Sequence, residues 1–213
     1  MDEATEGLRE RKRVRTRRAI AGAALELFDR QGFHATTIPQ IAEAADVSPR
    51  TVSGYFPAKE DLAFPDADER ITALEQRLRV RSPGETTADA LRAWLPEIVD
   101  VDAETLAEQH RLRAVIDADE DLCTYERRYL VRAQAALTEA FAADLGVAPD
   151  TLEPRMAAAA PVTVCELLGR DVLVDEPRAA LAALDRALVF IGGGIGALQD
   201  RSPSRRSGPS GSS

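Results

Sequence analysis

Two helix-start signals with a tight turn between them lie in the stretch TIPQIAEAADVSPRTVSGY, residues 37–55. Thr37 and Gln40 have the spacing of a capping box, in which each side chain satisfies a backbone N–H at the beginning of a helix. Ser48 followed by Pro49 pairs an N-cap serine with proline at the first helical position. The intervening AADVS leaves room only for a short turn. The stretch therefore predicts a helix-turn-helix unit.

The sequence before this stretch predicts one more helix. Ile20, Ala24 and Phe28 recur at four-residue steps, as on one face of an amphipathic helix. Residues 1–12 are polar and lack this periodicity, so we expect a disordered arm there. Residues 13–64 are then predicted to form one three-helix domain.

Helical periodicity continues through the rest of the chain, and no segment has a strand pattern of any strength. Ala, Leu, Glu and Arg dominate the composition, and aromatic residues make up only 5%, which favours helices. The sequence predicts an all-α protein of about nine helices, with a larger helical domain at 66–199. The composition of residues 200–213, rich in Arg, Ser and Pro, predicts a disordered tail.

Charge is divided unevenly along the chain. The net charge is −9, but residues 8–58 carry nine Lys and Arg against five Asp and Glu, whereas residues 61–213 carry seventeen against twenty-seven. Phosphates repel an acidic surface, so any contact with nucleic acid belongs to the basic N-terminal part. The apolar runs are too short to span a bilayer, and the polar N-terminus lacks the apolar region of a secretion signal. We expect a cytoplasmic protein with no membrane partner.

The sequence gives no indication of metal or catalytic chemistry. Cys123 and Cys165 form neither a disulfide framework nor a metal-ligand pattern. No Ser-His-Asp or Cys-His arrangement is recognisable, and the carboxylates are spread along helix faces. We therefore predict no catalytic residue, no metal and no cofactor, and hence not an enzyme.

The segment RTRRAIAGAALELFDRQGFHATTIPQIAEAADVSPRTVSGYFPAKEDL, Arg15 to Leu62, joins the two helix starts with Gly32-Phe33, Tyr55-Phe56 and Lys59-Glu60. It resembles the DNA-binding domain of the TetR family of bacterial transcriptional regulators. Beyond residue 65 only the helical layout resembles that family. The resemblance implies double-stranded operator DNA as a partner, and family habit favours repression.

The second helix of the helix-turn-helix unit is expected to enter the major groove by its N-terminal end. Arg50 is the only long cationic side chain on this helix, and it is expected to pair with guanine O6 and N7 or, alternatively, to contact a phosphate. Tyr55 is either a phosphate contact or a packed core aromatic, and the arginines between residues 11 and 18 either lie near the DNA backbone or form a solvated run. The residues predicted to contact DNA are Arg17, Arg18, Thr37, Ser48, Pro49, Arg50, Thr51, Ser53, Tyr55 and Lys59.

The chain departs from the family pattern at two positions of this helix. The family usually has an aromatic residue where this chain has Ser53, and a polar or basic residue where it has Gly54. Serine still offers one hydrogen bond, but glycine presents no side chain and lowers helix stability by about 1 kcal/mol. We therefore expect a recognition surface centred on Pro49, Arg50 and Ser53.

A dimer is expected because one small domain makes few phosphate contacts, and specific operators are usually read by symmetric dimers. The last predicted helix carries an apolar seam at three- and four-residue steps, and the helix before it carries a second apolar face. As in the TetR family, these helices from two protomers are expected to form a four-helix bundle; packing within one protomer is the alternative. The predicted interface residues are Met156, Val164, Leu167, Leu181, Leu184, Leu188, Ile191 and Ile195.

Aromatic and apolar residues of the middle helices are candidates for a ligand pocket with a few polar groups. In the TetR family a small molecule bound there releases the protein from DNA, by a shift between conformers of different DNA affinity. The alternative is a regulator that is constitutive or controlled by a protein partner, in which these residues are only core or surface. The predicted pocket residues are Trp94, Leu95, His110, Ile116, Tyr125, Tyr129 and Phe141.

Gly192 to Ala197 fit G-x-G-x-x-A, a variant of the dinucleotide-binding fingerprint, so a dinucleotide-dependent oxidoreductase is a further alternative. That fingerprint needs a strand before it and an acidic residue about twenty positions after it. The preceding residues have a helical period, and only seventeen residues follow Gly196. We therefore interpret the glycines as a place where a partner helix approaches closely, with fraying or a kink expected at 192–196.

Overall fold

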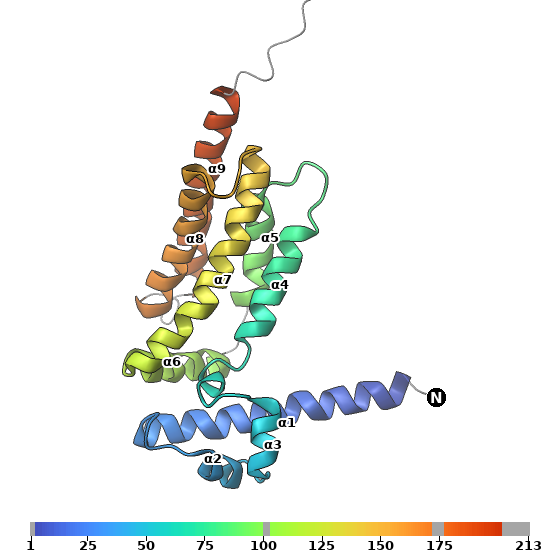
Figure 1. The fold of residues 1–213 in the computed structure, drawn as a ribbon, viewed down its shortest axis with the longest axis vertical. Helices are drawn as coiled ribbons and strands as arrows, with labels where there is room; N and C mark the ends of the chain where they lie inside the picture. The colour runs from blue at the N-terminus through green and yellow to red at the C-terminus, as the bar shows by residue number, and fades with distance from the viewer. Residues whose placement is uncertain (1–2, 100–102, 172–176, 202–213) are drawn as a thin grey trace, which may run out of the picture. The chain divides into compact units, whose positions relative to one another are not determined.

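The structure is a computed structural model that describes residues 3–99, 103–171 and 177–201. Over these residues the chain forms nine α-helices and one 3₁₀ helix and no strand, which confirms the all-α prediction (Figure 1). The elements are α1 (Glu3–Gln31), α2 (Ile38–Ala44), α3 (Pro49–Tyr55), the 3₁₀ helix η1 (Glu60–Ala63), α4 (Ala67–Arg79), α5 (Thr87–Val99), α6 (Ala103–Asp117), α7 (Glu120–Leu145), α8 (Leu152–Asp171) and α9 (Pro177–Arg201).

Contacts divide the chain into two compact units. The first unit holds the described residues up to Ala73 together with α6 and α7 as far as Arg132, and the second holds the remainder. The sequence predicted one domain boundary, near residue 65. In the structure the two units are not separated at a single point of the chain, because α4 and α7 each contribute residues to both units. The end of the predicted tail, residues 202–213, lies outside the described residues.

The core of the first unit is built on the apolar face of α1. Ile20 and Phe28 are at most 2% exposed, as are Ile41 of α2, Val52 of α3 and Phe56 directly after α3. Val115, Ile116 and Leu122, from α6 and the start of α7, belong to the same apolar cluster. Burying side chains of this size contributes roughly 1.5–3 kcal/mol each, so α2 and α3 are held by a core shared with α6 and α7.

The N-terminal arm is helical rather than disordered over its described residues, because α1 begins at Glu3. The prediction of a disordered arm over residues 1–12 is therefore wrong for residues 3–12. A helix propagates readily from a segment already held by packing, and Glu and Arg favour it. Arg13 and Glu10 form an exposed pair of 3.7 Å one turn apart, and Arg11 Nε donates to the Gly7 carbonyl at 3.1 Å.

In the second unit α9 packs against α5 and α8. Leu184, Leu188, Ile191 and Ile195 of α9 are 1–9% exposed and lie in one apolar cluster with residues of α5, α7 and α8. The prediction that these four residues face a second copy of the chain is wrong, since their own chain covers them. Helical periodicity shows that a face is buried but not what buries it. Val164, Leu167 and Leu181 belong to the same prediction, and their side chains lie outside those described.

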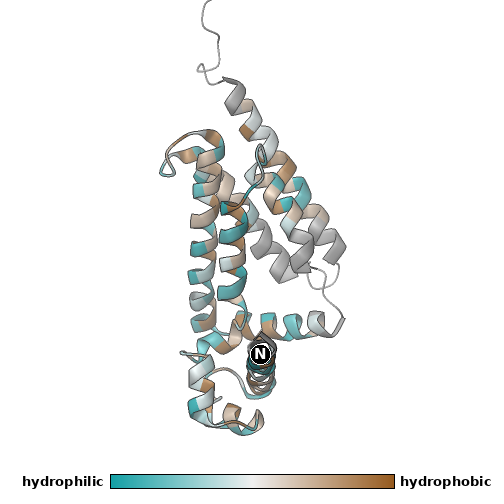
Figure 2. Cartoon of the chain, turned by 90° about the vertical axis from the view of Figure 1, so that its right-hand side faces the viewer, coloured by the Kyte–Doolittle hydropathy of each residue, from teal (hydrophilic) through white to brown (hydrophobic). Residues whose placement is uncertain are grey.

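The outward side of α8 and α9 carries different apolar residues. Phe190 is 83% exposed and Val189 57%, whereas on α8 Leu152 is 66% and Met156 62% exposed. Of the predicted interface residues with described side chains, Met156 alone lies on this outward side. In Figure 2, hydrophobic and hydrophilic residues alternate along the helices, as expected where each helix packs on one side.

The glycines of α9 lie inside one continuous helix. α9 runs without interruption from Pro177 to Arg201, so the helix does not fray at 192–196 as the sequence had suggested. A helix in place of the strand also contradicts the dinucleotide-binding alternative. A Cβ at Gly192 would lie 3.9 Å from the Ala88 Cβ of α5, so the close approach at this glycine is to a helix of the same chain.

None of the described helices is both long and apolar enough to span a membrane.

Candidate nucleic-acid interface

The beginning of α3 is fixed by its own side chains. Ser48 Oγ accepts a 3.0 Å hydrogen bond from the Thr51 backbone N–H, and the Ser48 and Thr51 hydroxyls lie 2.8 Å apart. Pro49 occupies the first helical position. These contacts confirm the N-cap predicted from the sequence, and they hold the first turn in one conformation.

The residues of α3 divide between a buried and an exposed side. Val52 is fully buried, whereas Pro49, Arg50, Ser53 and Gly54 are exposed. The exposed side carries one positive charge, that of Arg50. It also carries the hydroxyl of Ser53, which takes no part in the N-cap of α3. An exposed helix side of this kind offers base edges only a few polar side chains.

The beginning of α2 has the predicted capping box. The Thr37 backbone N–H donates to Gln40 Oε1 at 2.9 Å, and the Gln40 N–H donates to Thr37 Oγ1 at 3.4 Å. Gln31, at the end of α1, donates to the Thr36 hydroxyl at 3.2 Å and to Gln40 Oε1 at 3.4 Å. Gln31 thus ties α1 to the start of α2, a role for which the sequence carries no local signal.

Arg17 is occupied within the domain. Its Nε donates to the Pro65 carbonyl at 3.1 Å, a second bond to that carbonyl comes from Nη2, and its Nη1 donates to the Tyr55 carbonyl at 3.1 Å. The guanidinium also lies 4.6 Å from the centroid of the Phe56 ring. The sequence predicted a DNA contact for Arg17, but in the structure its guanidinium group is bound by partners inside the fold.

Lys59 is occupied in the same way. Its ammonium donates to the carbonyls of Phe33 and Thr36 at 2.9 and 3.1 Å, and it lies 4.1 Å from the centroid of the Phe33 ring. The side chain therefore holds the loop between α1 and α2. Tyr55 is half-buried and packs against the apolar cluster of the first unit.

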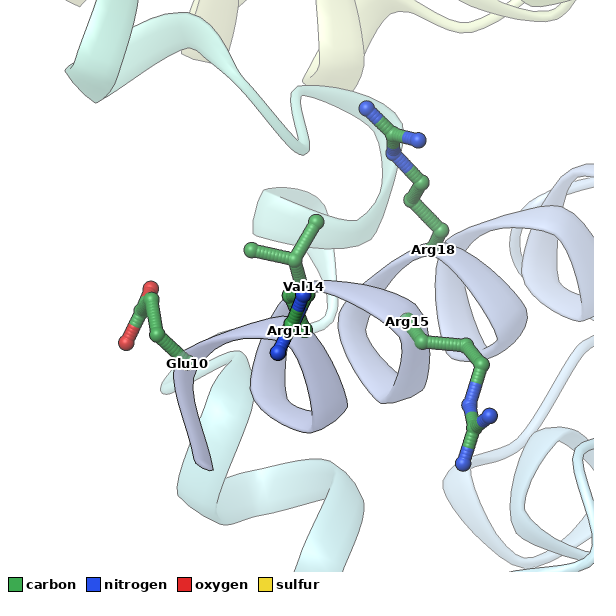
Figure 3. A pocket seen from close by; sticks show the side chains of 5 residues that line it. All are labelled: Glu10, Arg11, Val14, Arg15 and Arg18. Carbon is green, nitrogen blue, oxygen red and sulfur yellow. The ribbon is translucent and has the colours of Figure 1, made fainter. Parts of the chain in front are cut away.

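The N-terminal half of α1 presents a basic surface. Arg11, Arg15 and Arg18 line a shallow pocket together with Glu10 and Val14 (Figure 3). All five residues are exposed, and the side chains of Arg15 and Arg18 point in different directions from the helix. Exposed guanidinium groups on one helix are suited to contacting phosphate groups.

Residues 20–64, which contain α2, α3 and the buried part of α1, match the family model described as bacterial regulatory proteins, tetR family. The N-terminal domain belongs to the tetR family. This result confirms the resemblance seen in the sequence. The tetR-family domain accounts for the segment with the capping box, the tight turn and the Ser48 N-cap.

Similarity to known proteins extends beyond the tetR-family domain in two ways. The HTH-type transcriptional regulator TcmR of Streptomyces glaucescens is 42% identical over 102 residues, which are 46% of this chain and 45% of TcmR. The chain therefore matches less than half the length of that relative. Native NalD, the secondary repressor of the MexAB-OprM multidrug efflux pump in Pseudomonas aeruginosa, has a TM-score of 0.58 at 21% identity, covering 84% of this chain and 96% of NalD.

A second solved structure shows the same fold. FadR of Thermus thermophilus, a TetR-family transcriptional repressor crystallised in complex with lauroyl-CoA, has a TM-score of 0.54 at 21% identity. The match covers 92% of this chain and all of FadR. At this level of identity the likeness shows that the helices following the tetR-family domain share the fold of these regulators.

Six of the seven predicted pocket residues have described side chains, and these six are buried or half-buried within their own units. In the first unit Ile116 is buried, and Tyr125 and Tyr129 pack against the apolar cluster next to Phe64. His110 of α6 is half-buried. In the second unit Phe141 is fully buried and Trp94 packs against the same cluster, while the side chain of Leu95 lies outside those described. A pocket shared by these residues stays a prediction.

Tyr125 of α7 makes a specific polar contact with the end of the tetR-family domain. Its phenol donates to Asp61 Oδ1 of η1 at 2.6 Å. Burial, and next the hydrogen bond to the Asp61 carboxylate, raise the pKa of Tyr125 to about 12. The phenol therefore stays protonated and keeps donating at neutral pH.

Proposed function

We propose that this chain is a DNA-binding transcriptional regulator that recognises an operator with the exposed side of α3. The observation that carries the proposal is the division of α3 within a tetR-family domain. Arg50 and Ser53 are exposed beside the fixed N-terminal turn, and Val52 on the other side is buried. A helix anchored on one side and polar on the other is the arrangement that a recognition helix needs.

The side chains of this domain divide into those that touch DNA and those that hold the domain. Arg50 pairs with a guanine in the major groove, and Ser53 and Pro49 complete the base-facing surface. Thr37, Ser48 and Thr51 lie at helix starts, where hydroxyls and backbone N–H groups approach phosphates. Arg18, with Arg11 and Arg15, adds phosphate contacts from α1. Arg17, Lys59 and Tyr55 position these elements, because their polar or aromatic groups are engaged inside the fold.

The test is a DNA-binding titration with the full chain. Fluorescence anisotropy with labelled duplexes from the DNA next to its own gene is expected to show saturable binding to one duplex. Affinity for that duplex should fall linearly with salt on logarithmic axes, because phosphate contacts release counterions. Binding that is equally weak for every duplex, operator candidates and random sequence alike, would overturn the proposal.

We propose that the regulator is a homodimer that associates through the outward side of α8 and α9. Leu152, Met156, Val189 and Phe190 are each more than half exposed on these two helices. Gly193 lies one turn beyond Val189, and a Cβ there would meet nothing within 4 Å. Large apolar residues beside a position without a side chain favour the close packing of another helix. A second copy of the chain presents the same surface, as a two-fold interface requires.

We further propose that a partly apolar small molecule releases the repressor from DNA. FadR, which shares the fold, was crystallised with lauroyl-CoA, a ligand with a long apolar chain. A bacterial regulator of this type acts in the cytoplasm, where its operator lies, and catalysis forms no part of the proposal. Adding acyl-chain and aromatic compounds to the preformed DNA complex is expected to identify a class that dissociates it. Full DNA binding in the presence of every compound, together with no shift in melting temperature, would instead support control without a small molecule.

A further inference from the structure

Three metal-ligating groups converge where the loop between α1 and α2 meets the start of α7. His34 Nε2, in the loop between α1 and α2, lies 3.1 Å from Asp119 Oδ2 and 3.7 Å from Asp121 Oδ2. Asp119 precedes α7, and Asp121 lies in its first turn. All three residues belong to the first unit. The three ligand atoms lie within 4.8 Å of one another.

The separations suit a single small cation. Ligands held about 2.0–2.1 Å from a tetrahedral zinc ion are about 3.3 Å apart. The two distances from His34 Nε2, 3.1 and 3.7 Å, lie on either side of that value. One imidazole with two carboxylates also balances the charge of a divalent ion, because a metal-bound imidazole is neutral.

Asp119 is held in place by a second set of contacts. Its Oδ1 accepts the backbone N–H groups of Asp121 and Leu122, both at 3.1 Å, and so caps α7. This leaves Oδ2 directed toward His34, and the side chain is only 11% exposed. The His34 ring packs edge-on against Phe33, with centroids 5.4 Å apart, and Phe33 is itself buried. Such supporting contacts orient ligands before a metal arrives.

We propose that His34, Asp119 and Asp121 form a binding site for a divalent transition-metal ion of the zinc type. His34 and Asp121 are 70% and 73% exposed, which leaves room for water to complete the coordination. Imidazole nitrogen with carboxylate oxygen suits zinc and its neighbours better than magnesium or calcium, which prefer oxygen alone. The ion joins the loop before Thr37 to the start of α7. The effect of that link on DNA binding rests on the proposed function, but metal binding itself does not.

The test is calorimetric titration of the full, chelator-treated chain with zinc chloride. We expect one ion per protomer, and we expect His34→Ala and Asp121→Asn each to weaken binding about tenfold or more. Asp119→Asn should do the same, because asparagine still caps the helix but carries no charge. Glu120→Gln is the matched control, since this exposed neighbour is not part of the group, and it should bind as the wild type does. The chain's other histidine, His110, remains in every variant.

Titration of the wild type with cobalt(II) gives an independent measurement, because coordination produces visible absorption and shifts the ring resonances of a ligating histidine. No zinc binding up to about millimolar concentration, or equal affinity in wild type and His34→Ala, would overturn the proposal. Zinc binding without DNA binding would support the metal site and contradict the proposed regulator function. DNA binding without zinc binding would support the regulator function and contradict the metal site.

Discussion

The phenol of Tyr125 donates a 2.6 Å hydrogen bond to Asp61 Oδ1, while Oδ2 of the same carboxylate accepts the Ala58 backbone N–H at 2.8 Å. Asp61 lies in η1, at the end of the tetR-family domain, and Tyr125 lies in the first third of α7. The Tyr125 ring also stacks on Phe64, with centroids 5.9 Å apart. Within the first unit this carboxylate therefore fastens the end of the tetR-family domain to α7.

Tyr125→Phe is expected to lower the free energy of unfolding by about 1.5–3 kcal/mol at pH 7. The substitution keeps the aromatic ring but leaves Asp61 Oδ1 without the phenol, and hydrogen bonds to charged groups contribute about that amount. Urea denaturation followed by circular dichroism measures the difference. Tyr129→Phe is the control, because it keeps the Tyr125–Asp61 bond, and it should have the smaller effect.

The effect of Tyr125→Phe is also expected to depend on pH. The pKa of Tyr125 is raised to about 12 in the folded protein, against about 10 in an unfolded chain. The folded state therefore binds this proton more tightly, and the stabilisation is complete below pH 10 and is lost as the pH rises through 10 toward 12. The stability difference between wild type and Tyr125→Phe should shrink above pH 10. A difference that stays constant from pH 8 to pH 11 would contradict this assignment.

Arg17→Met should destabilise the first unit by about 1–3 kcal/mol, because the carbonyls of Tyr55 and Pro65 lose their donor. Methionine retains much of the aliphatic packing of the arginine stem. Arg18→Met is the matched control, since Arg18 is the exposed next residue of the same helix. Arg18→Met should leave the unfolding midpoint unchanged. It should weaken DNA binding, because one phosphate contact is lost. Equal stability of the two variants would show that the contacts of Arg17 are unimportant to the fold.

Arg50→Ala should weaken binding to the specific operator by roughly 1–3 kcal/mol and relax the preference for one base pair. Competition titrations against duplexes changed at single positions measure both quantities. Arg79→Ala removes an exposed arginine from the end of α4 and serves as the control. Should Arg50→Ala weaken all duplexes equally and lower only the salt dependence, Arg50 contacts a phosphate.

Phe190→Glu should convert the proposed dimer to a monomer without unfolding it, because Phe190 is 83% exposed. Leu188→Ala is expected to act differently. Leu188 is 1% exposed inside the second unit, so its truncation should lower stability by about 2–5 kcal/mol. Light scattering and thermal unfolding of both variants separate the two roles. Val80→Glu, at a 64% exposed valine directly after α4, should change neither; a dimeric Phe190→Glu would reject this interface.

The features that the sequence predicts most accurately are those determined by a few neighbouring residues. The capping box at Thr37 and the N-cap at Ser48 were predicted and confirmed because each involves residues within one helical turn. The apolar face of α9 was also predicted, but its partner was assigned wrongly, since periodicity does not distinguish a neighbouring helix from a second chain. The contacts of Arg17 and Lys59 were missed because carbonyls distant in sequence determine them. His34 and Asp119 are likewise brought together only by the fold.

α1 continues as one helix from its basic N-terminal half into the core of the first unit. The directions in which Arg11, Arg15 and Arg18 leave the helix are therefore fixed relative to the buried side chains of Ile20 and Phe28. One residue inserted between the two halves would turn the arginines by about 100° around the helix axis relative to the buried face, whereas four would nearly restore their direction. A flexible arm would tolerate every such insertion alike. The continuous helix α1 thus fixes the direction in which these arginines point relative to the core of the first unit.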